Sequence, residues 1–220
     1  MDVTITQDRI DLSPGAEIIL RQQTWADYEK LLESRQDKAG IRIYFDAKTQ
    51  EIRLMAPLPK HANRSDVIAD LVKCLLRHQR RNWQGFHPVT LKRFQQKGLE
   101  PDTCFYVQSC EAILRKEQID LEIDPPPDLA IEVDLTSFTK PENYQEIGVP
   151  ELWIYRKQSL GIYLFDGQSY QDSPDSLVFP EFPIKQLIPE FVEMAWNSGA
   201  GVALEAFEAR LRNDYEPRIS

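Results

Sequence analysis

The segment PPDLAIEVDLTSFTK, residues 126–140, places two carboxylates in what is otherwise an apolar strand. The run DLAIEVDL (128–135) is nearly all apolar, which is typical of a short strand that is covered on both faces. Glu132 lies inside this run, and Asp134 follows two residues later on the same face of the strand. A buried, unpaired carboxylate is costly, so such groups shift their pKa, find a partner or bind a metal. We therefore expect Glu132 to belong to a polar site.

A second segment, GLEPDTCFYVQ at residues 98–108, carries Asp102 at the start of another predicted strand. If the two strands are neighbours, Asp102 and Glu132 come together. Two carboxylates that leave room for water suit Mg²⁺ or Mn²⁺. Such a site fits phosphodiester hydrolysis, in which the metal lowers the pKa of a bound water. Lys140 follows closely in the chain, and its ammonium group could hold a phosphate oxygen or orient the attacking water.

The same residues also allow a purely structural explanation. Asp102 could cap a turn, and Glu132 could pair with a basic residue such as Arg93 or Lys92. Patterns of two acids and a lysine are common by chance, so spacing alone leaves both explanations open.

The composition limits the class of protein. The chain has 220 residues, of which 42% are hydrophobic and 28% charged, as expected for a soluble protein with a substantial core. Its net charge of −9 opposes general binding to nucleic acid, although a local basic groove would still be compatible with a nuclease. The sequence shows neither a membrane-spanning run nor a secretory signal. Its three cysteines form no CxxC pair, which suits reduced thiols in a cytoplasmic protein. Because no run is long enough to span a bilayer, we also expect no membrane partner.

The periodicity of apolar residues predicts helices and strands in a mixed order. Helices are expected at 24–35 and 61–82, near 140–146 and from 191 onward, a β-hairpin at 41–57, and strands at 86–95, 102–108, 128–135, 151–156, 159–166 and 177–182. This order predicts an α/β or α+β fold, with a mixed sheet flanked by helices. We expect one domain over 1–220, with a core at about 24–192 and a helical tail at 193–220.

Several segments resemble, in order, the motifs of the Uma-two-type family of endonucleases, which belongs to the PD-(D/E)XK nuclease superfamily and is abundant in cyanobacteria. The matching segments are GLEPDTCFYV, PPPDLAIEVDLTS, the K-x-x-x-Y pattern from Lys140 to Tyr144, and GVPELWIY at 148–155. The resemblance extends from about Trp25 to about Phe191. It implies a restriction-endonuclease-like fold and a DNA substrate, and by analogy a homodimer.

The resemblance also implies roles for individual residues. Asp102 matches the first metal-binding acid and Glu132 the second, and the backbone carbonyl of Val133 would be a further ligand of Mg²⁺ or Mn²⁺. The superfamily lysine normally stands two residues after the second acid, where this chain has Asp134. The resemblance places the lysine in the following segment, at Lys140, which would complete the catalytic set.

Three further residues are secondary candidates, together with Asp134. His61 begins the long helix, where it could reach the acids through water or could cap the helix or lie on the surface. Arg93 could steady a phosphate, and Tyr144 could pack beside Lys140 or in the core. Because Asp134 occupies the lysine position and the chain is acidic, a second function also fits the sequence. It is a nuclease-fold binding or regulatory module with weak or no catalysis.

Overall fold

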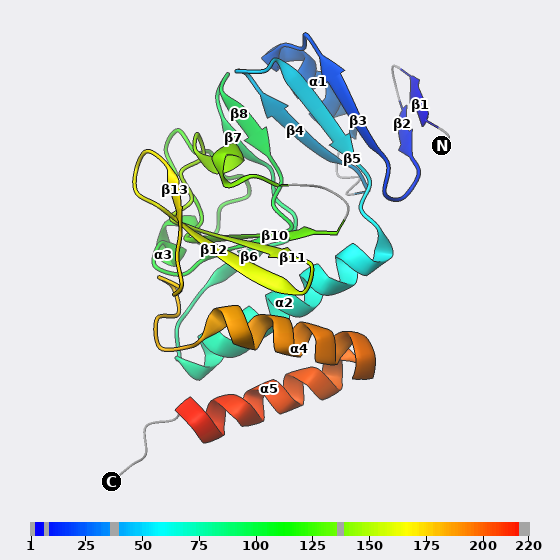
Figure 1. The fold of residues 1–220 in the computed structure, drawn as a ribbon. Coiled ribbons are helices and arrows are strands. Elements are labelled where there is room, and N and C mark those ends of the chain that lie inside the picture. The colour runs from blue at the N-terminus through cyan, green and yellow to red at the C-terminus, as the bar shows by residue number, and fades with distance from the viewer. Residues whose placement is uncertain (1–2, 7–8, 36–39, 136–138, 216–220) are drawn as a thin grey trace.

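The computed structural model describes residues 3–6, 9–35, 40–135 and 139–215, in which two β-sheets meet and helices cover their outer faces (Figure 1). The helices are α1 (Trp25–Arg35), α2 (Pro59–His78), α3 (Cys110–Ile113), α4 (Ile184–Ser198) and α5 (Ala200–Tyr215), and η1 (Pro141–Tyr144) is a short 3-10 helix. None of the helices in these ranges is long and apolar enough to cross a membrane.

Two sheets carry most of the strands, and a separate hairpin is formed by β1 (Val3–Thr6) and β2 (Arg9–Leu12). The N-terminal sheet has the order β3 (Glu17–Arg21), β5 (Glu51–Met55), β4 (Arg42–Asp46), β8 (Lys97–Leu99) and β7 (Leu91–Arg93). The central sheet has the order β13 (Tyr170–Asp172), β12 (Ser159–Phe165), β11 (Glu151–Arg156), β10 (Leu129–Asp134), β9 (Thr103–Tyr106) and β6 (Gln84–Phe86).

Strand β10 lies inside the central sheet, as its apolar sequence predicts. It runs parallel to β11, with Glu132 opposite Ile154, and antiparallel to β9, with Ile131 opposite Thr103. All six residues of β10 are buried. The mixed sheet flanked by helices is therefore confirmed. Strand β10, which carries Glu132, is a direct neighbour of β9, which begins immediately after Asp102.

The two faces of β10 meet different layers. Leu129, Ile131 and Val133 belong to the core that α2, α4 and α5 form under the central sheet, and Figure 1 shows these helices on the side away from the N-terminal sheet. Because side chains alternate along a strand, Glu132 and Asp134 point to the opposite face. The acids of β10 therefore face the junction of the two sheets.

The N-terminal sheet is held by α1, whose Tyr28 stacks on Phe45 with ring centroids 5.6 Å apart. Gly98 on β8 makes this packing possible, because a Cβ atom there would lie 2.2 Å from the Tyr28 hydroxyl. The chain then leaves β8 and enters β9 through Glu100 and Asp102. Asp102 thus stands at the point where the chain crosses from one sheet to the other.

Some expected elements differ from those observed. Residues 86–95 do not form one strand but contribute to β6 and β7, which lie in different sheets. The strand expected at 177–182 is wrong: the backbone amides of Leu177 and Val178 donate to the buried carboxylate of Glu151, at 2.7 and 2.8 Å, and are not available for strand pairing. The helical tail begins earlier than expected, at Ile184, and its last residues, 216–220, lie outside the described ranges.

Candidate active site

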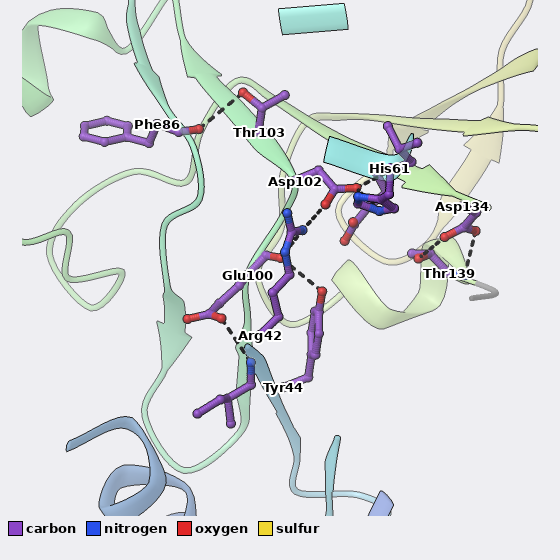
Figure 2. Close-up of polar contacts among 12 residues, drawn as sticks. Arg42, Tyr44, His61, Phe86, Glu100, Asp102, Thr103, Asp134 and Thr139 are labelled. Atoms are coloured by element: carbon purple, nitrogen blue, oxygen red, sulfur yellow. Dashed lines mark hydrogen bonds and ion pairs between the residues drawn. The ribbon is translucent and has the colours of Figure 1, made fainter. Parts of the chain in front are cut away.

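Asp102 is the centre of a buried polar cluster at the junction of the two sheets (Figure 2). Its side chain is 1% exposed, and its Oδ2 accepts a hydrogen bond of 2.6 Å from the backbone N–H of Val133 on β10. This contact ties the first acid to the strand that carries Glu132. The cluster therefore unites the two segments that the sequence singled out.

Arg42 on β4 supplies a positive charge to this cluster. Its guanidinium group forms an ion pair with Oδ1 of Asp102, and both side chains are buried. The carbonyl oxygen of Glu100 lies 3.5 Å from the same guanidinium nitrogen and accepts a hydrogen bond of 3.2 Å from the Tyr44 hydroxyl (Figure 2). Arg42 could not be identified from the sequence, because the hairpin at 41–57 carries several other charged residues, namely Asp46, Lys48, Glu51 and Arg53.

His61 reaches the same carboxylate from helix α2. Its Nε2 lies 3.2 Å from Oδ2 of Asp102, and the ring is 5% exposed. Pro59 stands in the first turn of α2 and Leu58 is its N-cap residue, so the helix start is set by backbone geometry and not by the histidine. His61 is thus in direct contact with the acid, and it does not cap the helix or lie on the surface.

Glu132 lies on the face of β10 that Asp102 also approaches, and it is 5% exposed. The hydroxyl of Tyr144, which belongs to η1, donates to its Oε1. Burial, together with the negative charge of Asp102, raises the pKa of Glu132 well above its ordinary value of 4.5, against the hydrogen bond from Tyr144. Tyr144 is therefore a buried partner of the second acid.

Asp102 has the opposite pKa shift. Burial alone would raise its pKa, but the Arg42 guanidinium and the contact with His61 lower it below its ordinary value of 3.8. Two neighbouring carboxyl groups whose pKa values are driven apart are typical of sites where one acid is ionised and the other readily holds a proton. A cation placed between Asp102 and Glu132 would relieve this repulsion.

Asp134 is held by other partners at the end of β10. It accepts hydrogen bonds of 2.8 Å from both the backbone N–H and the hydroxyl of Thr139, and it forms an ion pair with Arg156 on β11. The acid in the position of the superfamily lysine therefore binds Thr139 and Arg156.

The remaining basic candidates lie apart from the two acids. Lys140 is exposed just before η1, and no contact among the described residues joins it to Asp102 or Glu132. Arg93 donates to the backbone carbonyl of Glu146 at 3.3 Å and to that of Leu121. The alternative in which Arg93 pairs with Glu132 is therefore not observed, because the Arg93 guanidinium donates to these backbone carbonyls.

Lys92, the other suggested partner of Glu132, also binds elsewhere. Its Nζ lies 3.9 Å from Oε1 of Glu29 on α1. Neither of the suggested ion pairs with Glu132 is therefore present. The hydroxyl of Tyr144 donates a hydrogen bond to Glu132 instead.

A cavity of about 170 Å³ opens beside the acids. Glu132, His61 and Tyr144 line its inner part, while Thr49 and Asn143 line it near the surface. Of the two acids, Glu132 lines this space, whereas Asp102 does not line it but contacts His61, which does. No cluster of three or more His, Cys, Asp or Glu side chains with metal-binding geometry occurs in the described ranges. Mg²⁺ commonly uses one or two protein carboxylates and keeps several waters. The donor set therefore fits a hydrated Mg²⁺ or Mn²⁺ ion.

Replacing Tyr144 with phenylalanine tests its role as the partner of Glu132. The change removes one hydrogen bond to a buried acid, so we expect the free energy of unfolding to fall by about 1–2 kcal/mol. The hydrogen bond from Tyr144 lowers the pKa of Glu132, so that pKa should rise further in the variant. Urea unfolding at several pH values measures both effects. Unchanged stability and unchanged pH dependence would show that the contact is absent.

A known protein family and several solved structures are similar to this chain. The model of the family Uma2, described as "Putative restriction endonuclease", matches residues 25–196. No curated protein matches the chain significantly. A crystal structure from the cyanobacterium Anabaena variabilis, described as a "putative nuclease belonging to DUF820", is similar over 74% of this chain and 90% of that chain, with 18% sequence identity and a TM-score of 0.46.

Proposed function

Because this chain belongs to the Uma2 family of putative restriction endonucleases, we propose that it is a metal-dependent endonuclease that hydrolyses phosphodiester bonds in DNA. The observation that carries the proposal is the contact between Asp102 and the backbone of Val133, which joins Asp102 to the strand whose Glu132 lines a cavity. The restriction-endonuclease-like fold supplies Glu132 from β10 and Asp102 from the residue just before the neighbouring strand β9.

Asp102 and Glu132 would hold Mg²⁺ or Mn²⁺, with the backbone carbonyl of Val133 as a further ligand. Such a metal ion lowers the pKa of a bound water and neutralises charge on the scissile phosphate. Arg42 keeps Asp102 ionised and fixes one of its oxygens, while the amide of Val133 and the ring of His61 fix the other. The first acid is therefore held in place before substrate binds.

Tyr144 and Lys140 have different roles in this proposal. Tyr144 orients Glu132 by donating to one of its oxygens. Lys140 directly follows the partly buried Thr139, which lines the cavity together with Asn143. Its ammonium group would hold a phosphate oxygen or orient the attacking water. Its exposure leaves the ammonium group accessible to a phosphate that arrives from solvent.

The proposal is tested by incubating supercoiled plasmid and labelled single-stranded DNA with the purified protein in Mg²⁺ or Mn²⁺. We expect cleavage by the wild type that stops when the metal is chelated. Asp102→Asn should reduce the rate at least about 100-fold, and Lys140→Ala should reduce it about 100-fold, the typical effect of losing one group that stabilises transition-state charge. Lys30→Ala, which removes an exposed lysine on α1, is the matched control and should cleave normally.

Two outcomes would overturn this assignment. Cleavage that survives Asp102→Asn would come from another nuclease in the preparation. Binding of Mn²⁺ and DNA without cleavage by the wild type would instead identify a nuclease-fold binding module, a function that the acidic Asp134 in the lysine position also fits.

The proposal includes a cytoplasmic location and a homodimer. Cys74, Cys104 and Cys110 are unpaired and buried, as is typical of proteins from a reducing compartment. A dimer would supply two active sites, and sedimentation equilibrium of the purified chain measures whether it forms.

A further inference from the structure

We infer that the substrate is a single DNA strand or an unpaired strand end, and not an intact duplex. The inference rests on the proposed function and specifies the form of DNA that can reach the two acids. Three properties of the site support it: the burial of the acids, the size of the cavity and the charge of the cavity walls.

The acids lie below the protein surface. The side chains of Asp102 and Glu132 are 1% and 5% exposed, and of the two only Glu132 lines the cavity. A metal such as Mg²⁺ binds its ligands at about 2 Å, so a phosphate that it activates has to come equally close. The scissile phosphate must therefore enter the cavity. In an intact duplex the backbone is held by pairing and stacking, and a nucleotide can leave it only when both are broken.

The cavity is small. Its volume of about 170 Å³ is smaller than the roughly 300–1,000 Å³ of common small-molecule sites. Its walls come from β4, β5 and the turn between them on one side, and from β10 and η1 on the other. The inner wall contains Phe45 and Tyr144, which are buried core residues. These packed elements cannot separate to admit two paired strands without disrupting the core.

The cavity walls carry little free positive charge. Lys97 and Arg53 line the cavity, but Lys97 Nζ lies 2.6 Å from Asp46 and Arg53 Nε lies 3.0 Å from Glu17. Duplex binding depends on neutralising many phosphates on both strands, and the chain has a net charge of −9. A single strand that inserts one nucleotide presents few phosphates to the walls. The charge distribution therefore suits a single strand better than a duplex.

The test compares one labelled DNA strand in three forms in the presence of Mn²⁺: alone, in a perfect blunt duplex, and in a duplex with a single-stranded overhang. We expect the free strand to be cut about 100-fold faster than the blunt duplex, because only the duplex has to unstack and unpair a nucleotide. Cuts in the third form should map to the overhang. A relaxed, covalently closed plasmid should be cut much more slowly than the supercoiled form, in which unpaired regions open.

The outcomes separate this inference from the proposed function. Equal rates on the free strand and the blunt duplex would overturn the inference and leave the nuclease intact. If the wild type cuts none of these substrates, the proposed function fails, and binding then decides the inference. In that case the inference is upheld if fluorescence anisotropy shows tighter binding to the free strand, and overturned if it shows equal or tighter binding to the duplex.

A variant at the cavity entrance provides a second test. Thr49 is exposed on the turn between β4 and β5 and lines the cavity, so Thr49→Trp should narrow the entrance and reduce cleavage at least about 10-fold. Gln171→Trp, on the exposed edge strand β13, is the matched control and should cleave like the wild type. Thr49→Trp should also keep the wild-type affinity for Mn²⁺ and the wild-type melting temperature. Full activity of Thr49→Trp would show that DNA does not enter by this route.

Discussion

Replacing Asp102 with alanine is expected to lower the free energy of unfolding by about 3–5 kcal/mol, which is the effect of breaking a buried ion pair from one side. The change leaves the Arg42 guanidinium buried with its charge uncompensated, because both side chains are almost completely excluded from solvent. It also removes the acceptor for the backbone amide of Val133. Urea unfolding at neutral pH measures the loss.

A double-mutant cycle separates the ion pair from other effects. Arg42→Met should destabilise the protein to a similar extent, because it leaves Asp102 as a buried charge. The combined change should cost less than the sum of the two by at least about 2 kcal/mol. Asp172→Ala, which removes a mostly exposed partner of Lys185, is the control and should change the stability by no more than about 0.5 kcal/mol. If the losses of unfolding free energy in Asp102→Ala and Arg42→Met were strictly additive, the two side chains would not interact.

Glu132→Gln is expected to reduce the cleavage rate by about 1,000-fold or more. The same change is expected to stabilise the protein at neutral and alkaline pH. The amide keeps an acceptor for the Tyr144 hydroxyl but cannot bind a metal as a carboxylate does. In the wild type, burial and the charge of Asp102 disfavour the ionised form of Glu132, so the change removes an unfavourable charge. Activity and stability should therefore change in opposite directions.

The sign of the pH dependence follows from the raised pKa. Because folded Glu132 holds its proton more tightly than the unfolded chain does, its contribution to stability is complete below its ordinary pKa of 4.5. That contribution is lost as the pH rises toward the folded-state pKa, at up to about 1.4 kcal/mol per pH unit. The advantage of Glu132→Gln should therefore be absent at pH 4 and grow above it. Unfolding curves measured from pH 4 to pH 8 test this, and an advantage independent of pH would contradict it.

These two predictions also guide the choice of inactive variants. A loss of activity in Asp102→Ala could arise from unfolding, since the residue holds two sheets together through Arg42 and Val133. Glu132→Gln removes the second acid and is expected to leave the protein at least as stable as the wild type. It is therefore the better variant for attributing cleavage to this site.

Much of the fold was predictable from local patterns. The alternation at 41–57 predicted the hairpin of β4 and β5, and the continuous apolar run predicted β10 as a strand buried on both faces. The position of Asp102 ahead of β9 and of Glu132 inside β10 predicted that the acids would meet. The prediction of a strand at 177–182 was wrong because an apolar run does not show where its backbone amides donate. Two of these amides donate to Glu151.

The sequence by itself determined the buried strands, the two acids they carry and the family to which the chain belongs, because these depend on residue types at short, regular spacings. Only the tertiary structure decided which side chains surround the acids. Arg42 comes from another sheet, 60 positions before Asp102, and His61 comes from a helix, while Lys140 remains outside the cluster. Such contacts depend on how separate layers pack against each other, and this packing cannot be predicted from the local periodicity of the chain.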